Sequence, residues 1–200
     1  MKRSLLVLFL AVVMAVPTFA MEIIPKVGYL FSPQLSYKGE SFNKDSSFSA
    51  GADFMFQIGK TDLYIGPGIA WNQKHKIDDV GNIKFGFTNI FAVAKYKFKA
   101  GDVNLYPFLQ LGYGISNVDD YKYADEYEKS TVKFNGGIYY GIGFGAEYKN
   151  IVFELLYGWN KVIEDQERDI YDYYYSETRT YQWTMTYSSF RIQIGYKFSL

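Results

Sequence analysis

The only histidine of the chain, His75, is the first residue to consider for catalysis. It lies between Lys74 and Lys76, and two carboxylates, Asp78 and Asp79, follow shortly after it. A histidine held by a carboxylate can act as the base of a Ser–His hydrolase or of a His–Asp protease. No serine pairs recognisably with this group, and no metal-ligand spacing includes the histidine. We therefore expect no catalytic residue and no metal or cofactor site, and we interpret His75 as a solvated loop residue.

Charged and amide side chains recur at alternate positions inside otherwise apolar segments, most clearly in residues 190–200. Because successive side chains of a β-strand point to opposite faces, the large apolar residues of this segment share one surface and its polar or small residues share the other. The other apolar segments follow the same rule. The polar residues that the rule places on the second surface are Lys26, Asp53, Gln57, Gln110, Asn135, Glu147, Glu154, Arg191, Gln193 and Lys197.

Period-2 segments are needed to position these side chains, and the sequence contains about eight of them. They span about residues 22–36, 48–58, 63–71, 83–98, 103–115, 134–148, 151–159 and 190–200. A tilted strand of roughly 9 to 11 residues crosses a bilayer, and no apolar stretch after residue 20 is long enough for a transmembrane helix. Dispersed apolar residues on an even number of strands are typical of a transmembrane β-barrel.

The segment 83–98 leaves two alternatives open, because its apolar residues change parity. Phe85 and Phe87 have one parity, whereas Ile90, Ala92, Ala94, Tyr96 and Phe98 have the other. Either a β-bulge lies near Thr88 and Asn89, since one extra residue reverses the faces, or the upper part of the segment leaves the bilayer.

The connections between segments alternate in length. Those after the second, fourth and sixth segments are short, whereas those at about 37–46, 73–83, 117–132 and 161–181 are long and polar. Outer-membrane barrels have short periplasmic turns and long external loops, and aromatic residues cluster near the segment ends, as they do at membrane interfaces. We therefore predict an all-β fold: an eight-stranded antiparallel up-and-down transmembrane β-barrel with short periplasmic turns and four long external loops.

The N-terminal residues predict export. Lys2 and Arg3 precede a short apolar run and the small-residue site that ends at Ala20, which is the order found in a cleaved signal peptide. We assign residues 1–20 to this signal and 21–200 to the barrel, in a Gram-negative-type outer membrane. The mature chain then has 19 basic and 21 acidic residues, a net charge of −2 (19 − 21). Without a polybasic patch, nucleic acid is not expected as a partner.

Three short motifs resemble those of the small outer-membrane β-barrel domain family. Residues 106–114 resemble its "PY-apolar-x-apolar-G-x-G" strand, residues 141–157 resemble the hairpin that follows, and residues 195–198 resemble its terminal assembly signal. The resemblance implies an OmpA-like, OmpX-like or OmpW-like eight-stranded barrel surrounded by outer-membrane lipid and lipopolysaccharide. It also implies that the barrel-assembly machinery reads Tyr196, Phe198 and Leu200, although the family usually ends on Phe. No periplasmic domain follows the barrel, so a peptidoglycan tether is not implied.

The inward residues allow two readings of the lumen. The lumen of an eight-stranded barrel is just wide enough for side chains to fill, and buried charges need partners. We therefore expect a structural network that blocks the lumen, with Glu147 near Lys26 and Lys197. The alternative is a narrow channel for small or apolar solutes, as in OmpW-like proteins. Its lining would be Leu30, Met55, Tyr64, Tyr106, Phe108, Tyr139, Val152 and Leu156, beside Gly137, Gly141, Gly143 and Gly145.

The long external loops supply the functional prediction. They are acidic, and in the last one Tyr171, Tyr173, Tyr174 and Tyr175 interrupt the charge. Exposed tyrosines can mark a binding surface, which favours adhesion, host contact or contact with lipopolysaccharide through divalent ions. Alternatively, the odd-numbered aromatic residues from Tyr171 to Tyr187 extend the last two strands as a hairpin above the membrane. The main prediction is a non-enzymatic, structural or surface-interaction protein, and a lipid-modifying enzyme that depends on His75 is the third hypothesis.

Overall fold

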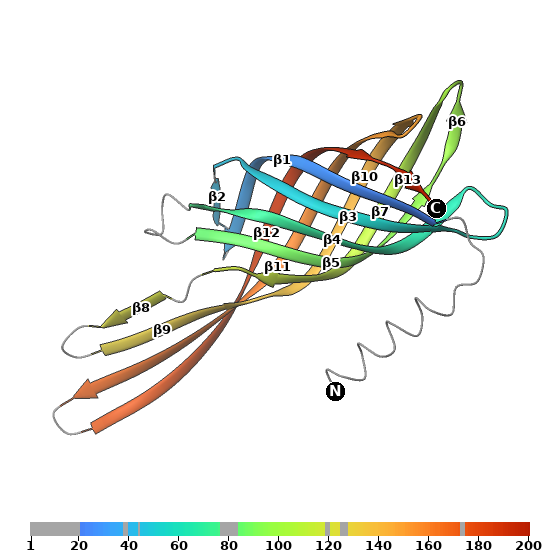
Figure 1. Cartoon of the computed structure of the whole chain (residues 1–200). Helices are drawn as coiled ribbons and strands as arrows, with labels where there is room; N and C mark the ends of the chain where they lie inside the picture. Colours follow the sequence, from blue (N-terminus) through green and yellow to red (C-terminus); the bar gives the residue numbers. More distant parts are fainter. Residues whose placement is uncertain are drawn as a thin grey trace.

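The computed structural model describes residues 21–37, 40–43, 45–76, 84–118, 121–124, 128–172 and 175–200. Its strands are β1 (Met21–Tyr37), β2 (Glu40–Asn43), β3 (Ser47–Gln57), β4 (Leu63–Lys76), β5 (Lys84–Tyr96), β6 (Phe98–Ala100), β7 (Val103–Ser116), β8 (Tyr121–Ala124), β9 (Glu128–Asn135), β10 (Gly137–Tyr148), β11 (Ile151–Asp172), β12 (Tyr175–Tyr196) and β13 (Phe198–Ser199). All of them belong to one sheet (Figure 1). The predicted signal peptide lies outside the described residues, so it and the domain boundary at residue 21 stay predictions.

Eight of these strands close into a ring. Their order is β1, β3, β4, β5, β7, β10, β11 and β12, and β12 returns to β1 with Gly195 opposite Lys26 and Arg191 opposite Leu30. Every pairing in the ring is antiparallel. The closed ladder satisfies the backbone N–H and C=O groups of the wall, which lipid cannot do. The predicted eight-stranded antiparallel barrel is therefore confirmed.

The two ends of the barrel differ. At one end, called here the turn end, tight connections contain Gly59, Gly101 and Lys149, with φ of 59°, 66° and 54°. A positive φ is easy for glycine and uncommon for lysine. At the other end, β11 and β12 continue well beyond the barrel wall (Figure 1). In outer-membrane barrels the short turns face the periplasm, so the extended end faces outward.

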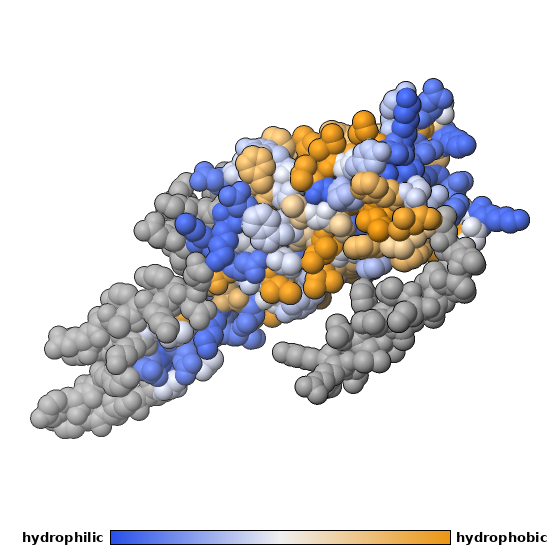
Figure 2. All heavy atoms as spheres, viewed as in Figure 1, coloured by the Kyte–Doolittle hydropathy of each residue, from blue (hydrophilic) through white to orange (hydrophobic). Residues whose placement is uncertain are grey.

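An apolar belt surrounds the barrel. Outward-facing residues that are exposed include Val27, Phe48, Ile69, Ile90, Leu109, Leu111, Ile115, Ile138, Ile142, Phe144, Ile151, Phe153 and Ile194. Figure 2 shows apolar residues along the barrel wall and hydrophilic ones toward its ends. Soluble monomers rarely expose so large an apolar surface, whereas the lipid-facing band of a transmembrane barrel requires one. Among the described residues, no helix is long and apolar enough to cross a bilayer.

Aromatic side chains border this belt. Trp159 stacks on Tyr140 with ring centroids 5.0 Å apart and meets the Tyr157 ring edge-on at 4.4 Å. At the turn end, the rings of Tyr196 and Phe198 lie 4.9 Å apart. Such girdles hold a barrel at the two water interfaces. Tyr196, Phe198 and Leu200 are all exposed on the outer surface, and their predicted role as an assembly signal stays a prediction.

The structure resolves the ambiguity of the fourth predicted segment. β5 alternates without a bulge of its own, and Phe85, Phe87, Phe91 and Lys95 all lie buried on the lumen side. Of the two alternatives, the bulge near Thr88 and Asn89 is therefore wrong. Phe85 and Phe87 are apolar because they fill the lumen, as Phe91 and Val93 do, whereas the even-numbered apolar residues from Ile90 to Tyr96 face lipid.

Two other expectations need correction. The predicted strand 134–148 is broken at Gly136, where the Gly114 carbonyl leaves no room for a side chain. This extra residue reverses the parity, so Phe134 packs toward the lumen and Asn135 is exposed. The predicted loops 117–132 and 161–181 also contain the strands β8 and β9 and the extended ends of β11 and β12.

Candidate functional site

A ring of four buried charges fills the centre of the lumen. Lys26 Nζ lies 2.7 Å from Asp53 Oδ2 and 2.8 Å from Glu154 Oε2. Lys95 Nζ lies 2.9 Å from Asp53 Oδ2 and 2.7 Å from Glu154 Oε1. The charges alternate in sign around the ring, and their four side chains are at most 3% exposed. We call these residues, from β1, β3, β5 and β11, the central ring.

The surroundings of the central ring add one hydrogen bond to it and shield it from water, while Asp53 Oδ1 has no hydrogen-bond partner among the described residues. Tyr106 Oη donates a hydrogen bond of 3.0 Å to Glu154 Oε1, and Lys95 Nζ lies 5.2 Å from the centre of the Tyr106 ring and 5.7 Å from that of Phe108. Buried ions are tolerated when each has opposite charges and hydrogen bonds. Two lysines and two carboxylates give the ring a net charge of zero.

A second ring of alternating charges, called here the turn-end ring, fills the lumen at the turn end. Lys97 Nζ contacts both Glu22 carboxylate oxygens at 2.9 and 2.8 Å and Glu147 Oε2 at 2.9 Å. Lys197 Nζ pairs with Glu147 and lies 3.8 Å from Glu22 Oε1. Lys97 also lies 4.1 Å above the Tyr64 ring. This ring too has two positive and two negative charges.

Apolar side chains pack the lumen between and beyond these charges. The first cluster surrounds the central ring and consists of Ile24, Met55, Ala70, Phe91, Val93, Tyr106, Phe108, Tyr139, Val152 and Leu156. The second lies nearer the extended end and consists of Leu35, Phe85, Phe87, Val162, Met185 and Tyr187. The glycines of β10 make room for this packing, because a side chain at Gly145 would overlap the Tyr106 ring.

A polar layer lies between the two apolar clusters. Asn89 lies on β5 between Phe87 and Phe91, and Asn160 lies on β11 between Leu156 and Val162. Their side-chain oxygens converge above Gly114, where neither has a hydrogen-bond partner within the described residues. The polar layer also contains Asn72, Ser49, Gln193 and Arg191, all buried.

Arg191 is the only buried cation of the polar layer. It is 2% exposed, and its Nε has no hydrogen-bond partner in the described part of the chain. No salt bridge of its guanidinium is found among the described residues either, because the buried carboxylates Glu22, Asp53, Glu147 and Glu154 pair with lysines. Arg191 therefore differs from the lysines of the two rings.

The predicted lumen residues are thus divided among several places. Lys26, Asp53 and Glu154 belong to the central ring and Glu147 and Lys197 to the turn-end ring, while Arg191 and Gln193 lie in the polar layer. Gln110 accepts a 2.5 Å hydrogen bond from Tyr139 Oη. Gln57 does not join the network, because its amide donates to the Thr61 carbonyl in the β3–β4 turn at 2.8 Å. Asn135 is exposed and donates to Asp165 at 2.5 Å.

Sequence reasoning missed three members of the rings: Glu22, Lys95 and Lys97. The parity of β5 could have found Lys95 and Lys97, since both follow Phe91 and Val93 at odd positions. Glu22 has the same parity as Lys26 on β1 and could have been assigned to the lumen by the same rule.

Beyond the barrel, β11 and β12 form a two-stranded ribbon that β9 and β8 widen. The ribbon runs from the pair Ile163 and Thr184 to the pair Asp172 and Tyr175. β9 pairs with β11 from Asn135 opposite Ile163 to Glu128 opposite Ile170, and β8 pairs with β9. We call this four-stranded sheet the extension. The structure confirms the alternative of a hairpin that extends the last two strands. A binding role for this segment stays a prediction.

The two faces of the extension differ in chemistry. On the face that carries Asp165, Glu167 and Asp169, Asp165 accepts hydrogen bonds from Asn135 of β9 and from Gln182 of β12, at 2.5 and 2.9 Å. This clasp ties three strands together. The opposite face has the parity of the lumen side and carries Arg168, Arg179, Tyr181 and Trp183, with the Arg168 guanidinium 5.7 Å from the centre of the Tyr181 ring.

Several predicted loop residues cannot be placed in this sheet. Tyr173 and Tyr174 lie outside the described residues, and the side chains of Tyr171 and Tyr175 do as well, although their backbones pair within β11 and β12. The backbone of His75 belongs to β4, and its side chain lies outside the described part. Among the described residues, no group of three or more metal-ligating side chains is found.

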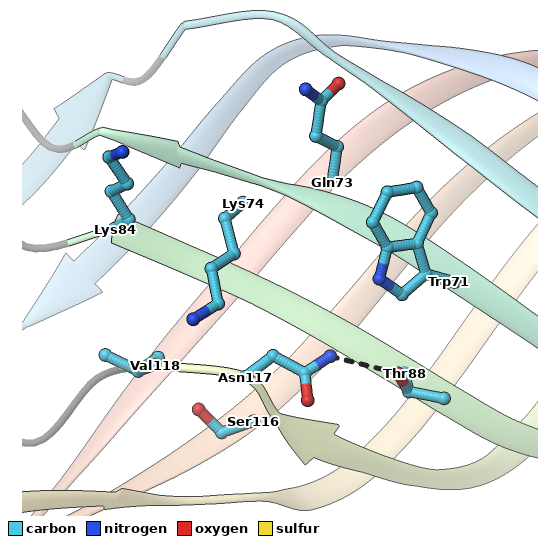
Figure 3. Close-up of a pocket in the computed structure, with 8 residues that line it drawn as sticks. All are labelled: Trp71, Gln73, Lys74, Lys84, Thr88, Ser116, Asn117 and Val118. Atoms are coloured by element: carbon cyan, nitrogen blue, oxygen red, sulfur yellow. Dashed lines mark hydrogen bonds between the residues drawn. The ribbon is translucent and has the colours of Figure 1, made fainter.

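A hollow of about 880 Å³ lies on the wall where β4, β5 and β7 reach the extended end. It is lined by Trp71, Gln73, Lys74, Lys84, Thr88, Ser116, Asn117 and Val118, and we call it the rim hollow (Figure 3). The Asn117 side chain donates a 2.9 Å hydrogen bond to Thr88 Oγ1, and its backbone N–H donates to the Gly86 carbonyl at 2.8 Å.

Comparisons with known proteins agree with this geometry at the level of the fold. No protein-family model matches the sequence, and no curated protein matches it. A major outer membrane protein from Thermus thermophilus is similar in structure, with 11% identity over 90% of this chain and 100% of that chain and a TM-score of 0.52. Neisserial surface protein A matches with 16% identity, 89% and 97% coverage and a TM-score of 0.49. The attachment invasion locus protein Ail of Yersinia pestis matches with 13% identity, 90% and 100% coverage and a TM-score of 0.45.

The closed eight-strand ring, the apolar belt and the likeness to the Thermus protein lead to one conclusion. The chain has the fold of an eight-stranded outer-membrane β-barrel.

Proposed function

We propose that this protein is a closed barrel that anchors the extension at the cell surface and acts there by contact, rather than by transport or catalysis. The observation that carries the proposal is the filled lumen: the central ring and the turn-end ring are charge-balanced, and two apolar clusters pack around and beyond the central ring. A solute would have to separate four mutually paired buried charges, which is costly.

The extension is the part of the protein that can reach a partner. Ten register pairs, from Ile163 and Thr184 to Asp172 and Tyr175, lie beyond the last lumen pair, Val162 and Met185. At about 3.3 Å per residue, they reach about 33 Å from the wall. This length presents the sheet well away from the lipid surface.

The aromatic face of the extension favours an anionic partner. Arg168 and Arg179 are directly opposed in register and so share one face. Together the two guanidinium groups give this face positive charge, which favours an anionic ligand. Tyr181 and Trp183 on the same face supply contact area at low entropic cost. A sulfated polysaccharide would suit this face, because its sulfate groups can pair with the arginines and its sugar rings can pack on the aromatic side chains.

Adhesion of reconstituted vesicles to immobilised heparin tests the proposal. Vesicles carrying the intact protein should be retained more than on a surface without heparin. A variant in which an Asn-Gly turn joins Ile163 directly to Thr184 should not be retained. Truncation at this pair keeps the strand register of the barrel. The double variant Arg168→Gln/Arg179→Gln should lose most retention. The matched double variant Glu167→Gln/Asp169→Asn changes the other face, and its vesicles should still be retained. Equal retention of intact and shortened barrels would refute a contact role for the extension.

The alternative of a narrow channel for apolar solutes rests on the apolar lumen lining, which the structure fills with packed rings. Phe91 and Tyr139 pack with centroids 5.6 Å apart, and Tyr106 and Phe108 with centroids 6.1 Å apart. Aromatic side chains that occupy the space beside glycines are a usual way for small barrels to fill their interior. We therefore favour the closed barrel.

A further inference from the structure

The polar layer crosses one half of the barrel wall over a single glycine. Gln193 of β12 and Ser49 of β3 are both paired in register with Gly28 of β1. A Cβ at Gly28 would lie 2.8 Å from Gln193 Cγ and 2.8 Å from Ser49 Oγ, so the two side chains meet above this glycine. Asn72 of β4 is the next register partner of Ser49. Buried polar side chains therefore lie side by side across four neighbouring strands.

The other half of the wall completes the polar layer in the same way. Asn89 of β5 is paired in register with Gly114 of β7, and Gly114 is paired with Gly137 of β10. The two glycines make room for Asn160 of β11, whose Oδ1 would overlap a Cβ at Gly114. All eight strands of the ring therefore contribute a polar residue or a glycine to this layer.

Arg191 brings a positive charge into the polar layer. It lies two positions before Gln193 on the lumen face of β12 and is 2% exposed. Its guanidinium acts electrostatically on the hydroxyl groups of Tyr139 and Tyr187. These two tyrosines belong to the apolar clusters on the two sides of the layer. The charge of Arg191 is therefore held between the clusters, away from both ends of the lumen.

This charge needs a negative partner, because a guanidinium stays protonated in proteins and a buried ion without an opposite charge is strongly destabilising. The buried carboxylates of the central ring and of the turn-end ring pair with lysines. Arg191 Nε has no hydrogen-bond partner in the described part of the chain. Because both rings are neutral, Arg191 gives the described part of the lumen one positive charge in excess. A single monovalent anion would balance it.

The remaining donors of the polar layer suit a small inorganic anion. The side-chain nitrogens of Asn72 and Asn89 and the hydroxyl of Ser49 are buried and have no hydrogen-bond partner among the described residues. Amide N–H and hydroxyl groups can donate to an anion beside a guanidinium, whereas the oxygens of the layer suit buried water. Apolar side chains border the layer on both sides, which favours an ion about as large as a water molecule over an organic acid.

We propose that the polar layer binds one chloride ion at Arg191. The ion neutralises the guanidinium and accepts hydrogen bonds from the amide and hydroxyl donors of the layer. An ion that binds only the folded barrel stabilises it by mass action, so chloride is a structural ion of this protein. Replacing Arg191 with Met removes the charge and releases the ion to water, so it leaves no buried charge behind. The site is independent of the contact role proposed for the extension.

The chloride dependence of unfolding tests this site. The full-length barrel is refolded in phosphatidylcholine vesicles, and urea unfolding is measured at increasing chloride, with gluconate keeping the ionic strength constant. Once the site is saturated, the ratio of folded to unfolded intact protein should rise about tenfold for each tenfold rise in chloride. Arg191→Met should show no chloride dependence. Arg191→Lys should restore part of it, because an ammonium group also pairs with an anion.

A matched variant and a second measurement keep the outcome decisive. Lys99→Met removes an exposed lysine at the turn end and should respond to chloride as the intact protein does. Heat-modifiable gel migration verifies that each variant is folded. Crystals of the intact barrel grown in bromide should show an anomalous peak beside the Arg191 guanidinium. The absence of a chloride response in the intact protein, an equal response in Arg191→Met, or the absence of bromide beside Arg191 would each overturn the proposal.

Discussion

Lys26 and Glu154, which are 128 positions apart in the sequence, form a 2.8 Å salt bridge inside the barrel. The bridge joins β1 to β11 across the lumen, whereas β12 lies between these strands in the wall. Asp53 also pairs with Lys26, Lys95 also pairs with Glu154, and the contact between Lys95 and Asp53 completes the central ring. The interior of this barrel is therefore held by contacts across the lumen as well as by the ladder of its wall.

Replacing Glu154 with Ala should strongly destabilise the barrel. The change leaves Lys26 and Lys95 with one shared carboxylate, and loss of one member of a buried charge pair typically costs about 3–5 kcal/mol. Urea unfolding of the refolded protein in lipid vesicles measures this loss. The matched change Glu167→Ala, on an exposed position of the extension, should alter the free energy of unfolding by less than about 0.5 kcal/mol. Similar values for the two variants would contradict a structural role for the central ring.

Arg191 should behave in the opposite way to Lys26. Because no salt bridge of Arg191 is found in the described part of the chain, Arg191→Met removes a buried charge without orphaning a carboxylate, and stability should stay equal or increase. Lys26→Met leaves Asp53 and Glu154 with only Lys95 and should cost several kcal/mol by the same reasoning. Comparable destabilisation by both changes in vesicle unfolding would show that Arg191 has a partner.

A methyl group at Gly145 should disturb the packing around the central ring. The Cβ of Gly145→Ala would overlap the Tyr106 ring, and overpacking typically costs about 1–3 kcal/mol. Tyr106→Leu removes both the ring and its hydrogen bond to Glu154, so it is destabilising alone. The double variant should lose less stability than the sum of the two single losses, since the smaller leucine relieves the overlap. Strict additivity in a double-mutant cycle would argue against this contact.

The alternation of side chains predicted the barrel because lipid and lumen impose opposite requirements on neighbouring residues. Phe190, Ile194 and Phe198 face lipid, and Arg191 and Gln193 face the lumen, as the terminal pattern predicts. The same rule misassigned Asn135, because Gly136 inserts one extra residue that no polarity pattern reveals. Gln57 has the lumen parity of its register partner Tyr64, but it lies where the turn begins and bonds to Thr61 rather than to the network.

The sites depend on information that local patterns do not contain. Lys95 and Lys97 were missed because Phe87 can face lipid or fill the lumen, which left the lumen face of the fourth segment undecided; its parity from Ile90 onward assigns both lysines to the lumen. The outward turn of Lys74 depends on a bulge opposite Gly86, which is a property of strand pairing. The extension was open as an alternative because strand-forming residues continue past the membrane on β11 and β12.

Single-channel recording in planar lipid bilayers tests the central claim, that the lumen is closed, most directly. Insertion is verified by heat-modifiable migration of the recovered protein, and a 16-stranded porin, whose lumen is an aqueous channel, serves as the conducting control. The intact central and turn-end rings predict no discrete conductance steps above the bare bilayer in molar salt. Reproducible unitary steps from the inserted protein would contradict the closed lumen and favour a channel.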